Sequence, residues 1–154
     1  MAIEQVKEYF KKHKIESRII ELPTSSATVK EAAESLGTEE ALIAKTLSFI
    51  VEDKPILIVA AGDAKIDNSK YKGQFHTKAK MIQYEDVNNL IGHNPGGVCP
   101  FAIKENVTVY LDESLKRFEH VYPACGSSNS AIKLSIQELE KYSNYTSWID
   151  VCKY

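Results

Sequence analysis

The sequence predicts a mixed α/β (α+β) fold built on a β-sheet that is curled rather than doubly wound and parallel. Three observations favour this class. Amphipathic helical segments and β-rich runs alternate along the chain, they show no regular βαβ period, and 44% of the 154 residues are hydrophobic, which is enough for a real core. The length is near that of an independently folding unit, so we expect a single domain over residues 1–154.

The N-terminal third is expected to form a helix, a short strand and a second helix. Apolar residues recur at helical spacing over residues 2–13, and a β-rich run at 18–22 is stopped by Pro23. The segment Thr28–Glu31 has the pattern of a capping box, and the helix that it opens is closed by Gly37.

The central part predicts a β-hairpin with strands at about 45–51 and 56–61, separated by a polar turn. Lys45 stands at the start of the first strand, inside an otherwise apolar run. A short helix at 67–73 and a short strand at 78–83 follow.

A helix at 84–91 is then expected, ended by a glycine and followed by a loop rich in Gly and Pro. In the C-terminal part, we expect strands at 107–111, 120–124 and 131–134, a short helix capped by Asp112, and a last helix opened by a capping box at Ser135.

The net charge, the absence of long apolar runs and the spacing of Cys and His limit the partners, location and metal sites that can be expected. The net charge of −2 gives no general attraction to nucleic acid, so we expect no DNA partner, and contact with RNA must be local. The N-terminus lacks the apolar core of a signal peptide and no run approaches a membrane span, so a cytoplasmic protein is expected. The odd number of cysteines argues against a disulfide framework, and the cysteines and histidines show no metal-binding spacing (Cys99, Cys125, Cys152, His13, His76, His93, His120).

The loop from Gly92 to Phe101, read together with Lys45, is the best candidate for a site. Glycines leave main-chain N–H groups free to turn toward a ligand, prolines hold that shape, and a lysine adds one positive charge. Such equipment suits an anion or a polarised carbonyl. The plainer alternatives are an edge-strand lysine that reaches solvent and a tight helix-to-strand connection.

The chain resembles the YbaK-type aminoacyl-tRNA deacylases, the free-standing relatives of the editing domain in bacterial prolyl-tRNA synthetases. The resemblance covers about residues 20 to 142. Four elements in family order carry it: Ile43 to Leu47, the GxxxP element Gly96 to Pro100 followed by Phe101, Val109 to Leu115, and a segment containing Gly126 that closes with Ile132 to Leu134. It implies a barrel-like curled sheet surrounded by helices.

The activity that the resemblance implies is hydrolysis of the ester between an amino acid and the terminal ribose of a misacylated tRNA, with a small amino acid on tRNA(Pro) or a related tRNA. No cofactor or metal is needed. The resemblance implies that Lys45 is the functional lysine and that Gly96 and Pro100 belong to the GxxxP element. We expect the main-chain N–H groups of Gly96, Gly97 and Val98 to stabilise the oxyanion. The other residues expected around the substrate are Thr46, Cys99, Pro100, Phe101, Gly126, Ser128 and Asn129.

Four of these residues differ in the role expected of them. Cys99 has His93 six residues away, but relatives carry Ser or Thr there, so Cys99 is expected to line the pocket rather than attack the ester. Ser128 and Asn129 stand where some relatives carry a histidine, which leaves the amino-acid specificity open; they also suit a simple turn. Thr46 should point to the opposite face of its strand from Lys45.

A lysine-rich segment offers the local RNA contact. Between residues 65 and 80 the sequence contains five lysines, interleaved aromatic residues and a single acidic residue. These lysines are the expected tRNA-binding residues (Lys65, Lys70, Lys72, Lys78, Lys80). The alternative is a solvated surface. The expected partners are an aminoacyl-tRNA and, by resemblance, an aminoacyl-tRNA synthetase, with no membrane partner. Two other functions stay open: a non-catalytic tRNA- or synthetase-binding module, and a hydrolase of small aminoacyl esters.

Overall fold

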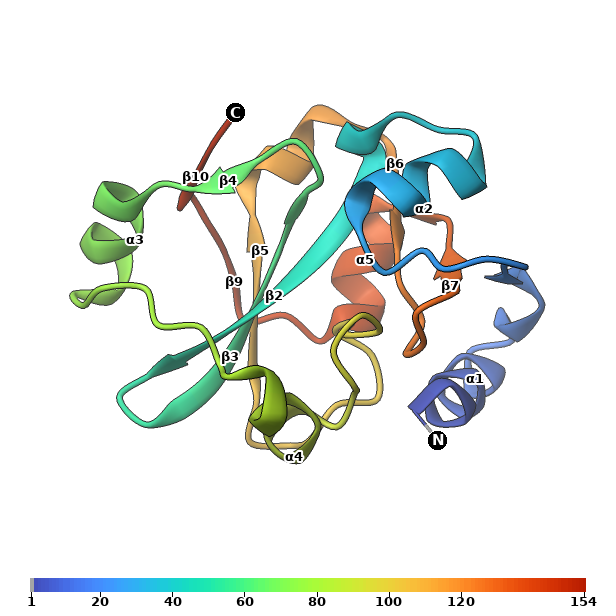
Figure 1. Ribbon diagram of the computed structural model, residues 1–154, viewed down its shortest axis with the longest axis horizontal. Helices are drawn as coiled ribbons and strands as arrows, with labels where there is room; N and C mark the ends of the chain where they lie inside the picture. Colours follow the sequence, from blue (N-terminus) through green and yellow to red (C-terminus); the bar gives the residue numbers. More distant parts are fainter. Residues whose placement is uncertain (1) are drawn as a thin grey trace.

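A computed structural model describes residues 2–154, and its centre is a curled six-stranded sheet in the order β8-β6-β2-β3-β5-β9. Figure 1 shows the long β2–β3 hairpin crossing the middle of the molecule. The sheet is mixed, since β2–β3 and β6–β8 are antiparallel whereas β2–β6, β3–β5 and β5–β9 are parallel. The expected mixed α/β class with a barrel-like curled sheet is confirmed.

The hairpin joins β2 (Ile43–Val51) to β3 (Lys54–Ala61) through a two-residue turn. Both turn residues, Glu52 and Asp53, have positive φ, at 51° and 63°. This backbone matches a type I′ turn, whose twist suits a tight hairpin. From Pro55 to Ala61 every residue of β3 is buried, because β2 and β5 flank it and helices cover its faces.

Short strands complete the sheet and form two small pairs beside it. The sheet also contains β5 (Thr108–Asp112), β6 (His120–Pro123), β8 (Leu134–Ser135) and β9 (Ser147–Ile149). Antiparallel pairs form between β1 (Ile19–Glu21) and β7 (Ser130–Ile132), and between β4 (Lys65–Ile66) and β10 (Cys152–Lys153).

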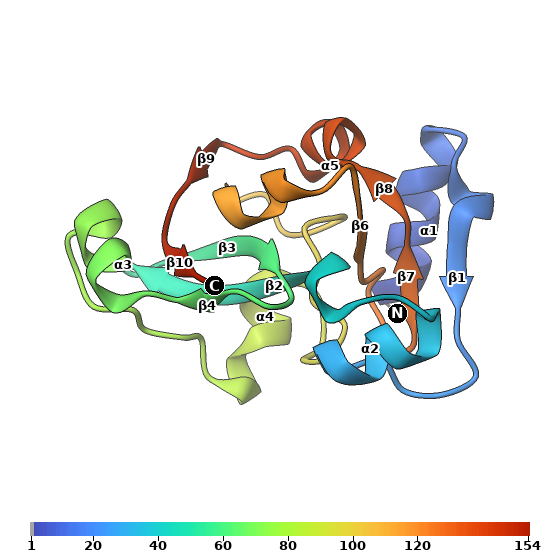
Figure 2. The same ribbon diagram turned by 90° about the horizontal axis from the view of Figure 1, so that it is seen from above.

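In the described part of the chain, five α-helices surround the sheet. Figure 2 shows α5 on one side of the hairpin and α2 and α4 on the other, with α1 beside the β1–β7 pair and α3 at the far end. Their bounds are α1 Ala2–Lys12, α2 Val29–Leu36, α3 Asn68–Phe75, α4 Val87–Ile91 and α5 Ile136–Ser143. Short 3₁₀ turns occur at Glu16–Arg18 (η1), Glu40–Leu42 (η2), Tyr84–Asp86 (η3) and Glu113–Arg117 (η4).

The helix ends follow the predicted signals. Thr28 with Glu31 and Ser135 with Glu138 both form complete capping boxes. Gly37 and Gly92 end α2 and α4 in the left-handed conformation. Asp112 caps η4 by accepting a hydrogen bond from Ser114 N, as expected, although the turn is 3₁₀ rather than α.

Three expected elements are different in the structure. The strand expected at 131–134 is divided between β7 and β8, which belong to different sheets. The helix expected at 84–91 begins as the 3₁₀ turn η3 and continues as α4. The segment 78–83 forms no strand of its own; it makes two main-chain hydrogen bonds to β2, from Ile50 N to Lys80 O and from Ile82 N to Ser48 O.

The interrupted pairing of β2 creates the site. On the side away from β3, β2 pairs with β6 at Ile43 and Ala44 and with the 80–82 segment at Ser48 and Ile50. Residues 45–47 lie between these two partners. A pocket opens there, beside one of the two central strands of the sheet.

Candidate active site

The pocket has a volume of about 490 Å³, within the usual range for a small-molecule site. Five segments far apart in the sequence line it: Ser26 to Val29 with Ala32, Ile43 to Ser48, Met81 with Ile82, Tyr84 and Val87, Pro95 with Gly96 and Val98, and Tyr122 with Ala124, Ser130 and Ala131. The lysine of β2 and the glycine loop therefore meet in one hollow.

The lining is largely apolar, and within residues 2–154 Lys45 is its single ionisable group apart from Tyr84 and Tyr122. Among the described residues that line the pocket there is no Asp, Glu, His or Cys. A side-chain carboxylate or imidazole base is therefore not part of the wall. The chemistry available here comes from one ammonium, several hydroxyls and main-chain groups.

Lys45 is half-buried, and main-chain carbonyls hold its ammonium. Nζ donates to Gly62 O, at 3.5 Å, and to Ala64 O, both in the connection from β3 to β4. Burial lowers the pKa of Lys45, attraction by Cys152 and Asp63 opposes that shift, and Lys65 adds to it. The cation is thus anchored by neutral dipoles rather than paired with a carboxylate.

Thr46 also lines the pocket, next to Lys45 on β2. Its Oγ1 is buried and has no hydrogen-bond partner within residues 2–154. An unpaired buried hydroxyl costs free energy, so a ligand in the pocket that supplied a partner to Oγ1 would be favoured.

The glycine loop is closed at its base by a buried histidine. His93 Nε2 donates to Phe101 O at 2.7 Å, and Lys104 N donates to Ile91 O at 3.0 Å. Within the loop, Gly97 N donates to Asn94 O at 3.0 Å, which forms a turn. These hydrogen bonds fix the conformation of the loop, and none of the residues that make them lines the pocket.

The three expected amide donors are therefore not equivalent. Gly96, with φ of 92°, and Val98 line the pocket, whereas Gly97 is buried and does not. The expectation for Gly97 needs correction, because its N–H already bonds to Asn94 O and is not free to bind an oxyanion. The left-handed φ of Gly96 is a conformation in which other residues are strained.

Cys99 does not line the pocket, contrary to expectation. It is fully buried, with Sγ 3.5 Å from His93 Nε2 and 3.7 Å from Phe101 O. Burial raises the pKa of the Cys99 thiol to about 12 and lowers the pKa of His93. The pair is the kind of Cys–His contact that a nucleophile needs, but the thiolate is disfavoured and the sulfur is out of reach.

Pro100, Phe101 and Gly126 also lie outside the pocket wall. Pro100 is buried, and the Phe101 ring packs against Phe10, with centroids 4.8 Å apart. Gly126, with φ of 94°, is buried against Ala2 and Val6. These three residues were expected to bind substrate, but their contacts belong to the core behind the loop.

Ser128 and Asn129 support the pocket rather than line it. Ser128 O accepts hydrogen bonds from the N and Oγ of Ser26, a residue that does line the pocket. Asn129 makes two hydrogen bonds with Leu22: its Nδ2 donates to Leu22 O, and its main-chain carbonyl accepts from Leu22 N. Together they hold the 22–26 segment in place.

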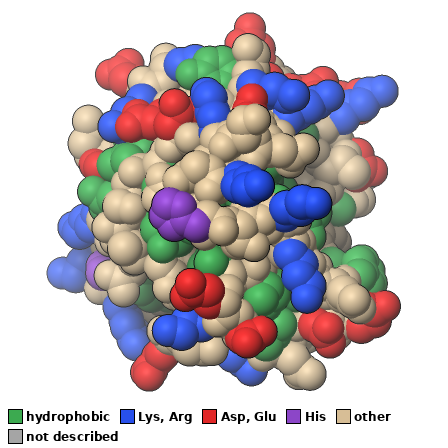
Figure 3. All heavy atoms as spheres, turned by 90° about the vertical axis from the view of Figure 1, so that its left-hand side faces the viewer, with side chains coloured by type: hydrophobic (Ala, Val, Ile, Leu, Met, Phe, Trp, Pro, Cys, Tyr) green, Lys and Arg blue, Asp and Glu red, His purple; other side chains and the backbone are tan. Residues whose placement is uncertain are grey.

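The five lysines expected to bind tRNA are exposed around α3 and the segment that follows it. Lys70 is already engaged, since its Nζ donates to Asp150 Oδ1 at 3.0 Å and to Cys152 O at 2.9 Å. Figure 3 views the end of the molecule that carries α3 and shows Lys and Arg side chains in the middle of this face, with acidic groups toward its upper and lower parts. Lys78 and Lys80 lead directly to the pocket residues Met81 and Ile82.

Several pocket residues were not anticipated from the sequence. Tyr84 is 77% exposed and Met81 58% exposed, yet both stand at the pocket. Val29 and Ala32 of α2 and Tyr122 of β6 form apolar parts of the wall. The sequence offers no signal for Met81 and Tyr84, because the exposure of an apolar side chain is visible only in the folded structure.

In residues 2–154, no group of three or more His, Cys, Asp or Glu side chains is arranged to hold a metal ion. Within the same described range, no helix combines the length and apolar character that crossing a bilayer requires.

Comparison with known proteins agrees with this architecture. Residues 24–142 match the family model of the aminoacyl-tRNA editing domain. The protein YwhH of Bacillus subtilis (strain 168), which is uncharacterized, is 51% identical over 154 residues, covering 99% of this chain and 98% of its own. A candidate Cys-tRNA(Pro)/Cys-tRNA(Cys) deacylase of Enterococcus faecalis, EbsC, is 26% identical over 119 residues, covering 76% of this chain and 73% of its own.

A solved structure shares the whole fold. The crystal structure of a candidate trans-editing enzyme for prolyl-tRNA synthetase superposes with a TM-score of 0.87 at 26% identity, covering 99% of this chain and 98% of the other. The family match spans most of the chain, including Lys45, the glycine loop and every other segment of the pocket wall. On this evidence the chain belongs to the aminoacyl-tRNA editing domain family.

Proposed function

We propose that this protein is a trans-editing aminoacyl-tRNA deacylase, which hydrolyses the ester of a small amino acid wrongly attached to tRNA(Pro) or a related tRNA. One observation carries the proposal: Lys45 and the Gly96 and Val98 section of the glycine loop line the same pocket. Family membership and the similarity to EbsC support it.

The composition of the wall fits the chemistry of this ester. An aminoacyl ester is already reactive, so a site that holds it, stabilises the oxyanion and admits water or the neighbouring ribose hydroxyl is sufficient. A wall without an acidic, imidazole or thiol side chain meets that requirement. In the proposed complex, the Lys45 ammonium orients the ester carbonyl or terminal phosphate, and the amides of Gly96 and Val98 face the oxyanion.

The surroundings of the pocket fit an RNA end. Tyr84 and Met81 present apolar surface at the pocket, where an unstacked terminal base can pack; such stacking contributes about 1–3 kcal/mol per base. The exposed lysines around α3, of which Lys78 and Lys80 are nearest to the pocket residues along the chain, would contact phosphates of the acceptor end.

The apolar wall also limits the amino-acid selectivity of the pocket. Such a wall discriminates between side chains that differ by one methylene by only about 1–3 kcal/mol.

The test is single-turnover deacylation of Ala-, Ser- and Cys-tRNA(Pro) beside correctly charged Pro-tRNA(Pro). Wild type should cleave at least one mischarged tRNA well above the uncatalysed rate. Lys45→Met keeps a long side chain without the charge and should lose about 10²–10³ in rate, whereas Lys45→Arg tests charge alone. An unchanged rate in Lys45→Met would contradict the assigned role of the lysine.

Two controls separate the alternatives. Salt-sensitive tRNA binding with no cleavage of any ester would favour the non-catalytic binding module. Equal cleavage of an aminoacyl-tRNA and a small aminoacyl ester would indicate a hydrolase that does not recognise the tRNA body. Synthetase association can be followed in the same samples by gel filtration with prolyl-tRNA synthetase.

A further inference from the structure

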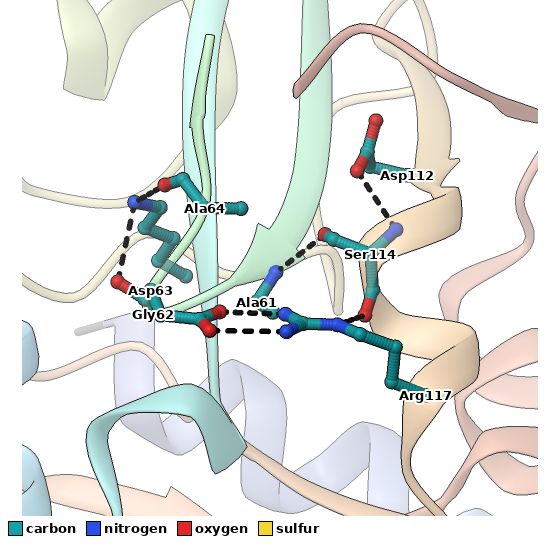
Figure 4. Close-up of polar contacts among 8 residues, drawn as sticks. Ala61, Gly62, Asp63, Ala64, Asp112, Ser114 and Arg117 are labelled. Atoms are coloured by element: carbon teal, nitrogen blue, oxygen red, sulfur yellow. Dashed lines mark hydrogen bonds and ion pairs between the residues drawn. The ribbon is translucent and has the colours of Figure 1, made fainter. Parts of the chain in front are cut away.

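The turn that holds the Lys45 ammonium contains a carboxylate that does not touch it. Gly62, Asp63 and Ala64 connect β3 to β4, and the two flanking residues supply the carbonyls that bind Lys45 Nζ. Asp63, between them, points to the other side (Figure 4). The catalytic cation of the proposed reaction thus lies beside a potential counter-ion with which it is not paired.

Arg117 accounts for this arrangement. Its Nη2 and Nη1 donate to Asp63 Oδ1 and Oδ2 at 2.6 and 3.0 Å, which is the two-pronged geometry of a strong Arg–carboxylate pair. Two further contacts fix the Arg117 guanidinium. Its Nε donates to Ser114 O at 2.9 Å, and its Cζ lies 4.0 Å from the centroid of the Tyr154 ring. The guanidinium also holds the pKa of Asp63 below its ordinary value.

A second connection ties the start of the same turn to η4. Ser114 Oγ accepts a hydrogen bond from Ala61 N at 3.1 Å, and Ser114 N donates to the buried Asp112 at 2.9 Å. Asp112 also accepts from Val151 N at 2.9 Å. The turn is therefore attached to η4 at Ala61 and again at Asp63, on either side of the Gly62 carbonyl (Figure 4).

We propose that Arg117 is a positioning residue of this site, which fixes the 61–64 turn and keeps the Asp63 carboxylate from capturing the Lys45 ammonium. The inference rests on the proposed deacylase function for its catalytic consequence. Without Arg117, the Asp63 carboxylate would compete with the Gly62 and Ala64 carbonyls for the ammonium. The cation would then be neutralised and displaced from its place in the pocket.

The charges around Lys45 make the effect specific to this pair. The ammonium interacts electrostatically with three nearby side chains: Asp63 and Cys152 favour its charged form, and Lys65 disfavours it. Cys152 is buried, and burial raises the pKa of its thiol to about 12, so it stays neutral near pH 7. Asp63 is therefore the one negative group among these three at neutral pH.

The experiment compares Arg117→Gln, Asp63→Asn and the double variant. Single-turnover deacylation at saturating protein isolates the chemical step, and tRNA binding is measured separately. Arg117→Gln should lower the rate about 10- to 100-fold, as expected for a displaced catalytic group, with unchanged tRNA affinity. Asp63→Asn in the same chain should restore most of the lost rate, because the competing carboxylate is gone.

A purely structural role makes the opposite prediction. If Arg117 only stabilises the turn, the double variant is as slow as Arg117→Gln or slower, and this result would overturn the inference. Arg117→Lys, which keeps the charge but loses the two-pronged contact, serves if Arg117→Gln does not fold. The matched control is Arg18→Gln, which breaks a similar two-pronged pair with Glu138 away from the pocket and should leave the rate unchanged.

A second measurement does not depend on activity. NMR titration of the Lys45 side chain, assigned by the signal that disappears in Lys45→Met, reports the pKa of the ammonium. Arg117→Gln should raise that pKa, and Asp63→Asn should lower it again in the double variant. If wild type cleaves no ester, the proposed function fails while this titration still decides the role of Arg117; an unchanged pKa in Arg117→Gln overturns it.

Discussion

Gly97 packs directly against the main chain of Gly126, so closely that a Cβ on Gly97 would lie 2.7 Å from the Gly126 carbonyl carbon. The glycine loop thus rests on a second loop some thirty residues later in the chain. That second loop also anchors the 22–26 segment through Ser128 and Asn129. The 126–129 loop therefore supports two parts of the pocket region, the glycine loop by main-chain packing and the 22–26 segment by hydrogen bonds.

The first prediction is that Gly97→Ala is harmful although Gly97 contributes no donor. The added methyl would meet main-chain atoms of Gly126 and Ser127, which cannot rotate away. The substitution should lower the free energy of unfolding by about 1–3 kcal/mol and reduce the deacylation rate by shifting Gly96 and Val98. Urea denaturation and the single-turnover assay measure the two effects.

Gly73→Ala is the matched control for this substitution. Gly73 lies within α3, and a Cβ there would meet no atom within 4 Å. Because alanine favours helix, stability should rise by up to about 1 kcal/mol. If Gly97→Ala were as well tolerated as Gly73→Ala, the contact between the two loops would not matter as described.

Local signals in the sequence predicted local structure well. The capping boxes at Thr28 and Ser135 and the glycines at the helix ends appear in the structure as expected, because each depends on residues within one turn. The segment 78–83 is expected to form a short strand. Only tertiary contacts show that it supplies two hydrogen bonds to the edge of β2 instead.

The position of the candidate pocket was predictable from the sequence, but the set of loop residues that line it was not. Lys45 and Gly96 could be identified because a cation in an apolar run and a GxxxP element are unusual. Which side of the loop faces the pocket could not be inferred, so Cys99 and Phe101 were expected beside the substrate although they pack into the core. Neighbours in a loop point in different directions, and sequence spacing does not record those directions.

A second prediction concerns the buried thiol of Cys99. Since burial raises its pKa to about 12, the thiolate is scarce below that pH and the thiol should resist DTNB in the native protein at pH 8. Cys99→Ala should keep the deacylation rate within about threefold while losing about 0.5–3 kcal/mol of stability. Loss of activity in a folded Cys99→Ala variant would instead restore the cysteine-nucleophile hypothesis.

A third prediction separates two lysines of the segment proposed to bind tRNA. Lys70 is committed to Asp150 and to Cys152 O, whereas Lys78 is exposed beside the pocket segment. Lys78→Ala should weaken tRNA binding and reduce the slope of log K against log salt by about 0.7–0.9. Lys70→Ala should change that slope less. Equal slopes for wild type and Lys78→Ala, measured by filter binding, would remove this lysine from the interface.

The last prediction uses the ion pair between Arg18 and Glu138. Arg18 donates to both Glu138 oxygens at 2.6 and 3.0 Å, and this hydrogen bonding lowers the pKa of Glu138 from 4.5 to about 2. A carboxyl with a depressed pKa stabilises the folded state above its unfolded pKa and loses that contribution as the pH falls through the folded value. The difference in Tm between wild type and Arg18→Gln should therefore be constant above about pH 5 and shrink toward pH 2.

The matched control for this pH profile is Lys7→Gln. Lys7 makes a single 3.0 Å contact with the exposed Glu21, and such surface pairs contribute about 0–1 kcal/mol. Its Tm should follow wild type at every pH. An Arg18→Gln deficit of the same size at pH 2.5 as at pH 7 would mean that Arg18 acts through its other contact, the 2.6 Å hydrogen bond to Lys133 O, because a main-chain carbonyl does not titrate in this range.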